Sequence, residues 1–262
     1  MGKGKLALDF TGRVVAITGA SSGIGAATAR MFSQLGACVA LIDRDEKRLL
    51  NVMKDCFDIG YEPYALSADL LKTEEIECAA KKIRARFGCC DVLVNGAGIM
   101  PMSTLEKTSL DCLDLVFDAN VRSMFYLTQQ LLPEIISCCG CIVNVSSVCG
   151  IRAFPNLVAY NMSKAAVDHF TRSLALDLGP QGIRVNAVNP GVIRTNLLRT
   201  GGMGEEQYKE LMERSKTTHA LCRVGEPEEV ASCICFLASP LASFITGVTM
   251  PVDGGKQVMC PY

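Results

Sequence analysis

Short apolar runs alternate along the chain with longer stretches in which apolar residues recur every three or four positions. The runs are rich in valine and isoleucine and lie at 13–19, 38–44, 91–98, 141–147 and 183–191. Continuously apolar runs of this length are typical of strands that are buried on both faces of a parallel sheet. The periodic stretches predict helices at 23–36, 45–59, 73–87 and 156–178, a long one within 108–136, and another that begins near Pro227.

This alternation of strands and helices predicts an α/β fold. A βαβαβ order places parallel strands in one open, doubly wound sheet of the Rossmann type, with helices on both faces. No linker rich in proline, glycine or serine interrupts the 262 residues. We therefore expect residues 1–262 to form a single domain.

Composition and charge argue against several functional classes. Hydrophobic residues make up 49% of the chain, enough for a sizeable core, and a net charge of −1 without a long basic run argues against a nucleic-acid partner. No apolar run is long enough to span a bilayer, and the start MGKGKLALDF lacks the apolar core of a secretory signal. These features predict a cytoplasmic protein without a membrane span.

The chain contains 14 cysteines at irregular spacing. Cys138 and Cys141 form a C-x-x-C pair, but no second pair completes a zinc site and the two histidines, His169 and His219, lie elsewhere. We interpret these cysteines as small core and turn residues and expect no metal. So many thiols are typical of a reducing compartment.

A glycine-rich loop follows the first apolar run. In the stretch VAITGASSGIGAATARMF, residues 15–32, a strand leads directly into Gly19, Gly23 and Gly25, and a helix follows. Glycines permit a tight turn and let a pyrophosphate approach the backbone, where the helix N-terminus offers unpaired N–H groups. The spacing is G-x-x-x-G-x-G rather than G-x-G-x-x-G, and the strand–turn–helix setting favours a dinucleotide.

An acidic residue ends the second apolar run. Asp43 lies 18 residues after Gly25, where a carboxylate accepts hydrogen bonds from the adenosine ribose and repels a 2′-phosphate. This predicts NAD as the cofactor. The adjacent Arg44 could hold a 2′-phosphate, so NADP stays open as the alternative.

Five motifs occur in order along the chain: TGASSGIG, NGAG, NVSS, YNMSK and NPGVIRT. Together they resemble the short-chain dehydrogenase/reductase family in its compact single-domain form, and the resemblance extends from Gly12 to the VDGG at 252–255. It implies a sheet of about seven parallel strands. It also implies hydride transfer between NAD(H) and an alcohol or carbonyl substrate.

The resemblance assigns four catalytic residues. Tyr160 resembles the general acid/base and Lys164 its partner. Ser147 resembles the residue that holds the substrate oxygen, and Asn120 the residue that supports a water relay. The implied cofactor contacts come from Gly19, Ser21, Ser22, Gly23, Ile24, Gly25, Asp43, Arg44, Asp69, Leu70, Asn95, Gly96, Ala97, Tyr160, Lys164, Pro190, Gly191, Ile193 and Thr195.

Elementary chemistry explains why a phenol and an ammonium would share a helix face. Free tyrosine titrates near pH ~10, and a nearby cation lowers that pKa toward neutrality, where acid/base catalysis works best. Residues i and i+4 lie on one helix face, so Lys164 is expected to lower the pKa of Tyr160. Asparagine is disfavoured in helix interiors, so Asn120 indicates a local distortion of the helix. Gly96, where the family usually has asparagine, is expected to loosen the turn slightly.

A lid over the substrate is expected at about 196–220, with glycines 201, 202 and 204 as its hinge. Apolar side chains there and in the loops facing it favour a lipophilic alcohol or ketone. They are Met100, Met102, Ile151, Phe154, Leu157, Leu197, Leu198, Met203, Tyr208, Leu211 and Met212.

The resemblance implies a homotetramer through the helices at 106–136 and 156–178, with a dimer as the alternative. Two positions that are basic in bacterial carrier-protein reductases hold Cys138 and Leu176 here, which favours a free lipophilic substrate. An NADP(H)-dependent 3-oxoacyl reductase and a catalytically silent NAD-binding regulator stay open.

Overall fold

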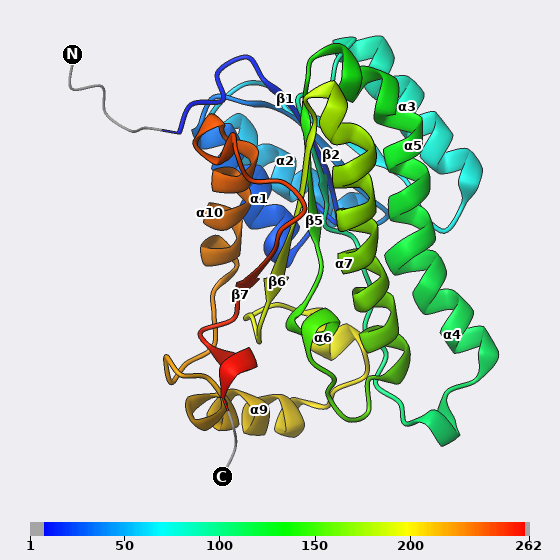
Figure 1. Ribbon diagram of the computed structural model, residues 1–262, viewed down its shortest axis with the longest axis vertical. Coiled ribbons are helices and arrows are strands. Elements are labelled where there is room, and N and C mark those ends of the chain that lie inside the picture. Colours follow the sequence, from blue (N-terminus) through cyan, green and yellow to red (C-terminus); the bar gives the residue numbers. More distant parts are fainter. Residues whose placement is uncertain (1–7, 260–262) are drawn as a thin grey trace.

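The computed structural model describes residues 8–259. Its centre is a parallel sheet of seven strands in the order β3-β2-β1-β4-β5-β6-β7 (Figure 1). The strands are β1 (Val14–Thr18), β2 (Cys38–Asp43), β3 (Tyr64–Ser67), β4 (Val92–Asn95), β5 (Cys141–Val145), β6 (Arg184–Pro190) and β7 (Thr249–Val252). The expected doubly wound parallel sheet is confirmed.

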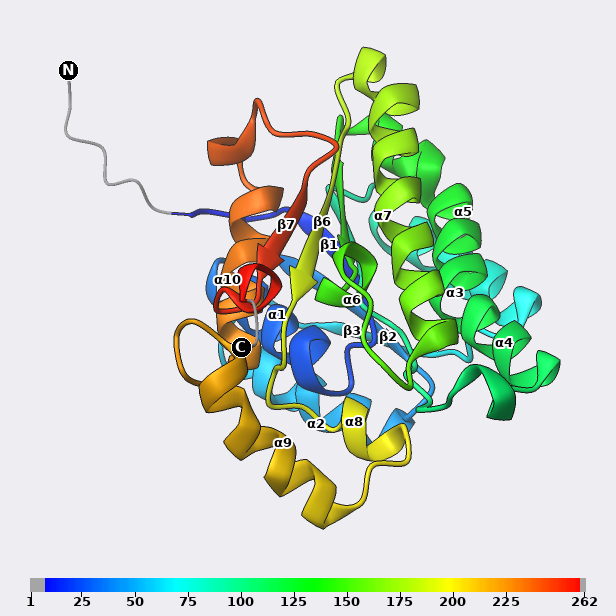
Figure 2. The same ribbon diagram turned by 60° about the horizontal axis from the view of Figure 1, so that its bottom comes forward.

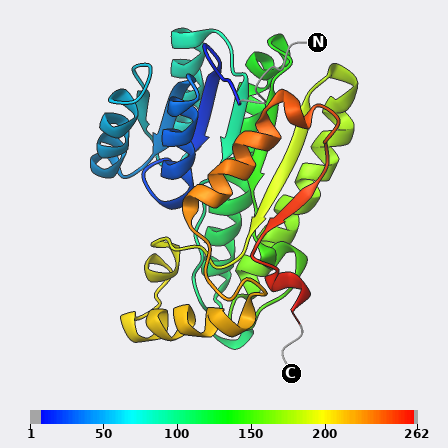
Figure 3. The same cartoon turned by 90° about the vertical axis from the view of Figure 1, so that its left-hand side faces the viewer.

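Helices cover both faces of the sheet. The α-helices are α1 (Gly23–Gln34), α2 (Glu46–Phe57), α3 (Thr73–Phe87), α4 (Leu110–Phe117), α5 (Ser123–Ser137), α6 (Val148–Ile151), α7 (Val158–Leu178), α8 (Leu197–Thr200), α9 (Glu205–Thr218) and α10 (Pro227–Ala238). One layer consists of α1, α2 and α10, and the other of α3, α5 and α7 (Figures 1 and 3). Among residues 8–259, no helix has the length and apolarity needed to cross a bilayer.

Each layer packs against its own half of the core. Val15 and Ile17 of β1 contact the α1, α2 and α10 side, whereas Ala16 between them contacts the α3, α5 and α7 side. Both faces of the strand are therefore apolar, which explains the continuously apolar runs in the sequence. The buried cysteines Cys90 and Cys141 fill this core as small side chains.

The sequence pattern missed two strands and one helix break. The edge strands β3 and β7 are short and only partly buried, so they lack a continuous apolar run. The predicted long helix within 108–136 is instead α4 and α5, joined by a π-helical segment at Asp118–Arg122. The distortion expected at Asn120 is thus confirmed, because Asn120 lies in this segment.

The strand order places the site at the carboxyl ends of the central strands. Strand order reverses between β1 and β4, which are hydrogen-bonded neighbours, and ligands in open α/β sheets bind beyond the carboxyl ends of the strands at such a point. Beyond those ends lie α8 and α9, which follow β6 (Figure 2).

Candidate active site

A cleft of about 1430 Å³ opens at the carboxyl ends of the strands. It is large enough for a dinucleotide together with a small substrate. Of the residues expected to form the site, the cleft wall contains Gly19, Ser21, Ser22, Gly23, Ile24, Gly25, Asp43, Arg44, Asp69, Leu70, Gly96, Ala97, Ser147, Tyr160, Lys164, Pro190, Gly191, Ile193 and Thr195. Asn95 and Asn120 are not part of this wall.

The glycine loop needs its glycines for two different reasons. Gly19 has φ +69°, and a Cβ there would lie 2.8 Å from the Gly96 carbonyl oxygen. Gly25 lies so close to the same turn that a Cβ would collide with the Gly19 carbonyl oxygen. The first turn of α1 therefore packs directly on the end of β1.

The N-terminus of α1 is left open toward the cleft. The N-cap Ser22 makes no side-chain capping bond, and the first turn carries no acidic residue. Its free N–H groups and the positive end of the helix dipole suit a pyrophosphate. This open helix end, with glycines before it, fits the phosphates of a dinucleotide.

Asp43 stands at the end of β2 beside this loop. One carboxylate oxygen accepts a hydrogen bond from the Ser21 N–H at 3.2 Å, and the other accepts one from the Asp45 N–H at 3.0 Å. Two backbone donors thus hold the carboxylate at the cleft wall, where Arg44 also lies. A fixed carboxylate here fits a ribose diol.

Hydrogen bonds to the end of β1 hold the turn after β4 in place. The Gly96 and Ala97 N–H groups both donate to Thr18 Oγ1, at 2.9 and 3.1 Å. A Cβ on Gly96 would lie 2.7 Å from the Thr18 carbonyl oxygen. The turn is therefore not loosened as expected. Because Gly96 has no side chain, the ends of β1 and β4 approach closely.

Asn95 is buried beneath the turn. Its side-chain NH₂ donates to Thr128 Oγ1 at 3.1 Å and to Asn144 Oδ1 at 2.9 Å. Asn144 is its partner residue on β5. Asn95 therefore ties β4 to β5 and α5, and its place is under the site, not in the cleft wall.

Asn120 is fully buried in the π-helical segment. Its side-chain oxygen accepts from the Ile99 N–H at 2.8 Å, while its NH₂ donates to the Ile99 carbonyl at 3.0 Å and to Ser163 Oγ at 3.0 Å. The side chain thus fixes the loop after β4 against α7. The extra residue of the π turn brings the amide to this position.

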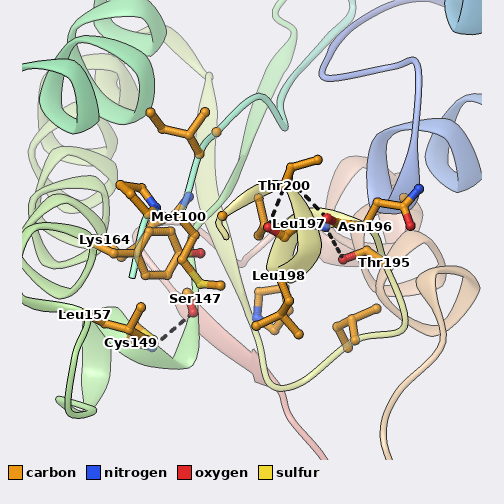
Figure 4. A pocket seen from close by; sticks show the side chains of 18 of the residues that line it. Met100, Ser147, Cys149, Leu157, Lys164, Thr195, Asn196, Leu197, Leu198 and Thr200 are labelled. Carbon is orange, nitrogen blue, oxygen red and sulfur yellow. Dashed lines mark hydrogen bonds between the residues drawn. The ribbon is translucent and has the colours of Figure 1, made fainter. Parts of the chain in front are cut away.

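The phenol, the ammonium and the serine converge at the centre of the cleft. Lys164 Nζ lies 5.6 Å from the Tyr160 ring centroid and donates to the Val145 carbonyl at 2.8 Å. Ser147 follows β5, and its hydroxyl accepts from the Cys149 N–H at 3.1 Å (Figure 4). These side chains come from α7 and from the end of β5, which the crossover brings together.

The pKa directions differ from the expectation for Tyr160. Burial raises the pKa of Tyr160, the nearby Cys149 thiol raises it further, and Ser147 only partly offsets this. Burial also lowers the pKa of Lys164 to about 8. The pKa of Tyr160 is therefore raised, and the prediction that it is lowered is wrong, because burial is the largest cause of the shift at both groups.

Two supporting residues were not identified from the sequence. The Asn189 side chain donates to the Ser147 carbonyl at 2.8 Å and to both carboxylate oxygens of Asp168 at 3.0 Å. Asp168 lies one helical turn after Lys164 on α7, so the i, i+4 spacing was an available signal. Together they fix the backbone that carries Ser147.

An apolar wall surrounds the reacting groups. Met100, Cys149 and Tyr160 form one buried cluster, with Phe154, Leu157, Leu197 and Leu198 packed against it. Figure 4 shows Met100, Cys149, Leu157, Leu197 and Leu198 around the cleft. Met102, Met203 and Leu211 also line the cleft, whereas Ile151, Tyr208 and Met212 do not. Tyr208 is instead buried under the Arg199 guanidinium, 3.7 Å from its ring centroid.

The cysteines of the described residues are all free thiols. Cys138 and Cys141 form no disulfide, and burial raises the pKa of both thiols. Within residues 8–259, no group of three or more His, Cys, Asp or Glu side chains is arranged to hold a metal ion.

Comparison with known proteins identifies the family of the chain. The family model described as enoyl-(acyl carrier protein) reductase matches residues 19–257. A 3-oxoacyl-[acyl-carrier-protein] reductase of Thermotoga maritima is 38% identical, covering 96% of this chain and 100% of the relative. A meso-2,3-butanediol dehydrogenase of Serratia marcescens is 36% identical, covering 95% and 96%.

Among solved structures, a short-chain dehydrogenase/reductase of unknown function from Caenorhabditis elegans, determined with cofactor, superposes with a TM-score of 0.91. It is 32% identical, and the match covers 96% of this chain and 97% of that one. Fold, site and relatives together define an oxidoreductase. The chain belongs to the short-chain dehydrogenase/reductase family.

Proposed function

We propose that this protein is an NAD(H)-dependent dehydrogenase or reductase of small lipophilic alcohols and ketones. The observation that carries the proposal is that one cleft contains the glycine loop, Asp43, Ser147, Tyr160 and Lys164. A nicotinamide dinucleotide bound at the glycine loop supplies the acceptor or donor of the hydride. The chain's own groups handle the substrate oxygen and its proton.

Tyr160 is proposed as the general acid/base. In oxidation its oxygen takes the hydroxyl proton of the substrate, and in reduction its O–H protonates the carbonyl oxygen. Ser147, held by Asn189 through its backbone, orients that oxygen and stabilises its developing charge. Lys164 supplies a positive charge beside the phenol, and burial in the apolar cluster excludes water from the proton transfer.

NAD is preferred over NADP on the basis of Asp43. Its carboxylate is held by the Ser21 and Asp45 N–H groups at the cleft wall, and this fixed negative charge opposes a 2′-phosphate. Arg44 forms no ion pair within residues 8–259 that would neutralise Asp43.

The helices α8 and α9 are proposed as the substrate lid. Gly201 packs against the Met100 carbonyl so closely that no Cβ fits, and Gly202 has φ +99°. These glycines join α8 to α9, so a hinge there would move the apolar wall of α8 relative to the cleft.

A homotetramer is proposed from the exposed apolar face of α4, α5 and α7. Phe125 is 49% exposed, Met162 48% and Leu176 80%. Large apolar side chains exposed on neighbouring helices favour an interface.

The test is a cofactor-reduction assay by absorbance with a panel of lipophilic alcohols, using NAD⁺ and NADP⁺. We expect turnover with NAD⁺ and its loss in Tyr160→Phe, which keeps the ring and removes only the proton donor. Turnover that survives in Tyr160→Phe would refute the assigned role. Tight NADH binding without turnover of any substrate would favour a silent NAD-binding regulator instead.

A further inference from the structure

Three basic side chains line the substrate end of the cleft. Arg152 follows α6, Arg214 lies on α9, and Lys256 lies in the turn after β7. Figure 1 shows these three segments gathered at the same end of the molecule, beyond the carboxyl ends of the strands. The proposed reaction with a neutral alcohol gives these charges no role.

Contacts between the three segments hold two of these cations in place. Arg152 Nη1 donates to the Gln257 carbonyl at 3.3 Å and to the Met259 carbonyl at 2.7 Å, so it fixes the turn that carries Lys256. Lys256 Nζ donates to Thr218 Oγ1 at the end of α9, at 3.4 Å. The turn after β7, α6 and α9 thus form one basic wall.

Lys256 also connects this basic wall to the reacting groups. Its ammonium lies 5.3 Å from the Phe154 ring centroid. Phe154 packs against the cluster of Met100, Cys149 and Tyr160. A ligand whose oxygen meets Tyr160 and whose other end passes along Phe154 therefore reaches Lys256.

Among the residues that the structure describes, these three cations differ from neighbouring cations in having no acidic partner. Arg199, Lys216 and Arg223 pair with Glu205, Glu213 and Glu229. Within residues 8–259, no ion pair forms at Arg152, Arg214 or Lys256.

Two acidic groups lie near the basic wall, and within residues 8–259 neither forms an ion pair with it. The Asp253 carboxylate accepts from the Gly255 and Gln257 N–H groups at 2.9 and 2.7 Å, which holds it in the turn. Glu210 lines the cleft one helical turn before Arg214 without forming an ion pair. Burial lowers the pKa of Lys256, and the positive charges of Arg214 and Arg152 lower it further, partly offset by Cys149 and Asp253.

We propose that the substrate is an amphipathic hydroxy acid or oxo acid, whose carboxylate is bound by Lys256 and Arg214 on the wall braced by Arg152. The apolar wall of Met100, Phe154 and Leu198 would hold the chain between the carboxylate and the reacting carbon. A carboxylate matches both ammonium and guanidinium donors, and it would relieve the repulsion among the three cations.

The inference rests on the proposed function and adds no new chemical step. The substrate loses the C–H bond at the hydroxyl carbon and its O–H bond, and a carbonyl forms. The hydride electron pair reduces NAD⁺ to NADH, and the proton leaves through Tyr160. The carboxylate stays unchanged throughout.

The experiment compares matched substrates. Hydroxy acids of short and medium chain length are each assayed beside the corresponding hydroxy amide, which has the same length and no charge. The acid should have a kcat/KM at least about tenfold higher, mainly through a lower KM. The reason is that a hydrogen bond to a charged group strengthens binding by on the order of tenfold. The KM for the acid should rise with ionic strength, whereas the KM for the amide should not.

Lys256→Met keeps the length of the side chain over Phe154 and removes its charge. It should lower the acid-to-amide ratio of kcat/KM by about tenfold. Lys216→Met on α9, outside the cleft wall, is the matched control and should keep the wild-type ratio. Calorimetric titration of the acid onto inactive Tyr160→Phe should show the same loss on adding Lys256→Met, independently of turnover.

Equal turnover of acid and amide, with Lys256→Met changing neither ratio nor binding, would overturn the proposal and leave the alcohol dehydrogenase function intact. A preference for a phosphate monoester over the carboxylate would also overturn it as stated. Failure of every substrate, charged or neutral, would instead contradict the proposed function itself.

Discussion

The burial of the Lys164 ammonium leads to a quantitative prediction of how the free energy of unfolding depends on pH. Burial lowers its pKa from 10.5 to about 8. Each unit of pKa shift corresponds to about 1.4 kcal/mol, so at pH 7 the charged lysine costs the folded state about 3 kcal/mol. This cost is fully present below pH 8 and disappears as pH rises toward 10.5, because the unfolded chain alone binds the proton in that interval.

Lys164→Met removes this titration while keeping a side chain of similar length. It also removes the donor to the Val145 carbonyl, which costs about 1–3 kcal/mol and does not depend on pH. The pH-dependent part is therefore separable. Between pH 7 and 9.5, the free energy of unfolding of the wild type should rise by about 2 kcal/mol relative to Lys164→Met.

The measurement is urea unfolding of both proteins at pH 7 and 9.5, without nucleotide and with a reductant present. Titrating groups that do not interact with Lys164 cancel in the difference, and Cys149→Ser in both proteins removes the neighbouring thiol that does interact with it. A difference that stays constant within about 0.5 kcal/mol across this range would refute the argument that burial controls Lys164. It would mean that the ammonium is solvated in the folded protein.

Further predictions concern the cofactor end and the π-helical segment. Asp43→Ala should lower the NAD-over-NADP ratio of kcat/KM by about tenfold or more, because it removes a charged acceptor, and an unchanged ratio would contradict the cofactor assignment. Gly25→Ala should abolish the binding of NADH, measured by its fluorescence, because the added Cβ collides with the Gly19 carbonyl oxygen. Gly179→Ala is the control: the space around Gly179 is open, so this variant should bind NADH normally. Asn120→Ala should lower stability by about 2 kcal/mol or more in thermal unfolding, because both backbone groups of Ile99 lose their partner.

Much of this architecture was predictable because its signals are local. The glycine loop, the acidic strand end and the apolar central strands each follow from a few adjacent residues. The edge strands β3 and β7 were not predicted from the apolar pattern, because an edge strand needs no continuous apolar run. The π-helical segment was foreseen only as a distortion at Asn120, since its geometry depends on the bonds to Ile99, 21 residues earlier.

The electrostatics of the site were the least predictable part. The i, i+4 spacing of Tyr160 and Lys164 gives their proximity but not their burial, and burial decides the direction of both pKa shifts. The basic wall likewise combines residues from three distant segments, so only the tertiary structure brings Arg152 and Lys256 together.

The buried thiols give this protein a set of native probes of its own motions. Burial raises the pKa of Cys141 to about 11 and of Cys235 to about 12, so neither thiol reacts with an alkylating reagent while it is enclosed. Cys78 and Cys222 are exposed and will react at once. Alkylation rates followed by peptide mass spectrometry would therefore report how often β5 and α10 open, with no mutation or label added. Adding NADH would then show whether a ligand at one edge of the sheet slows opening in the core.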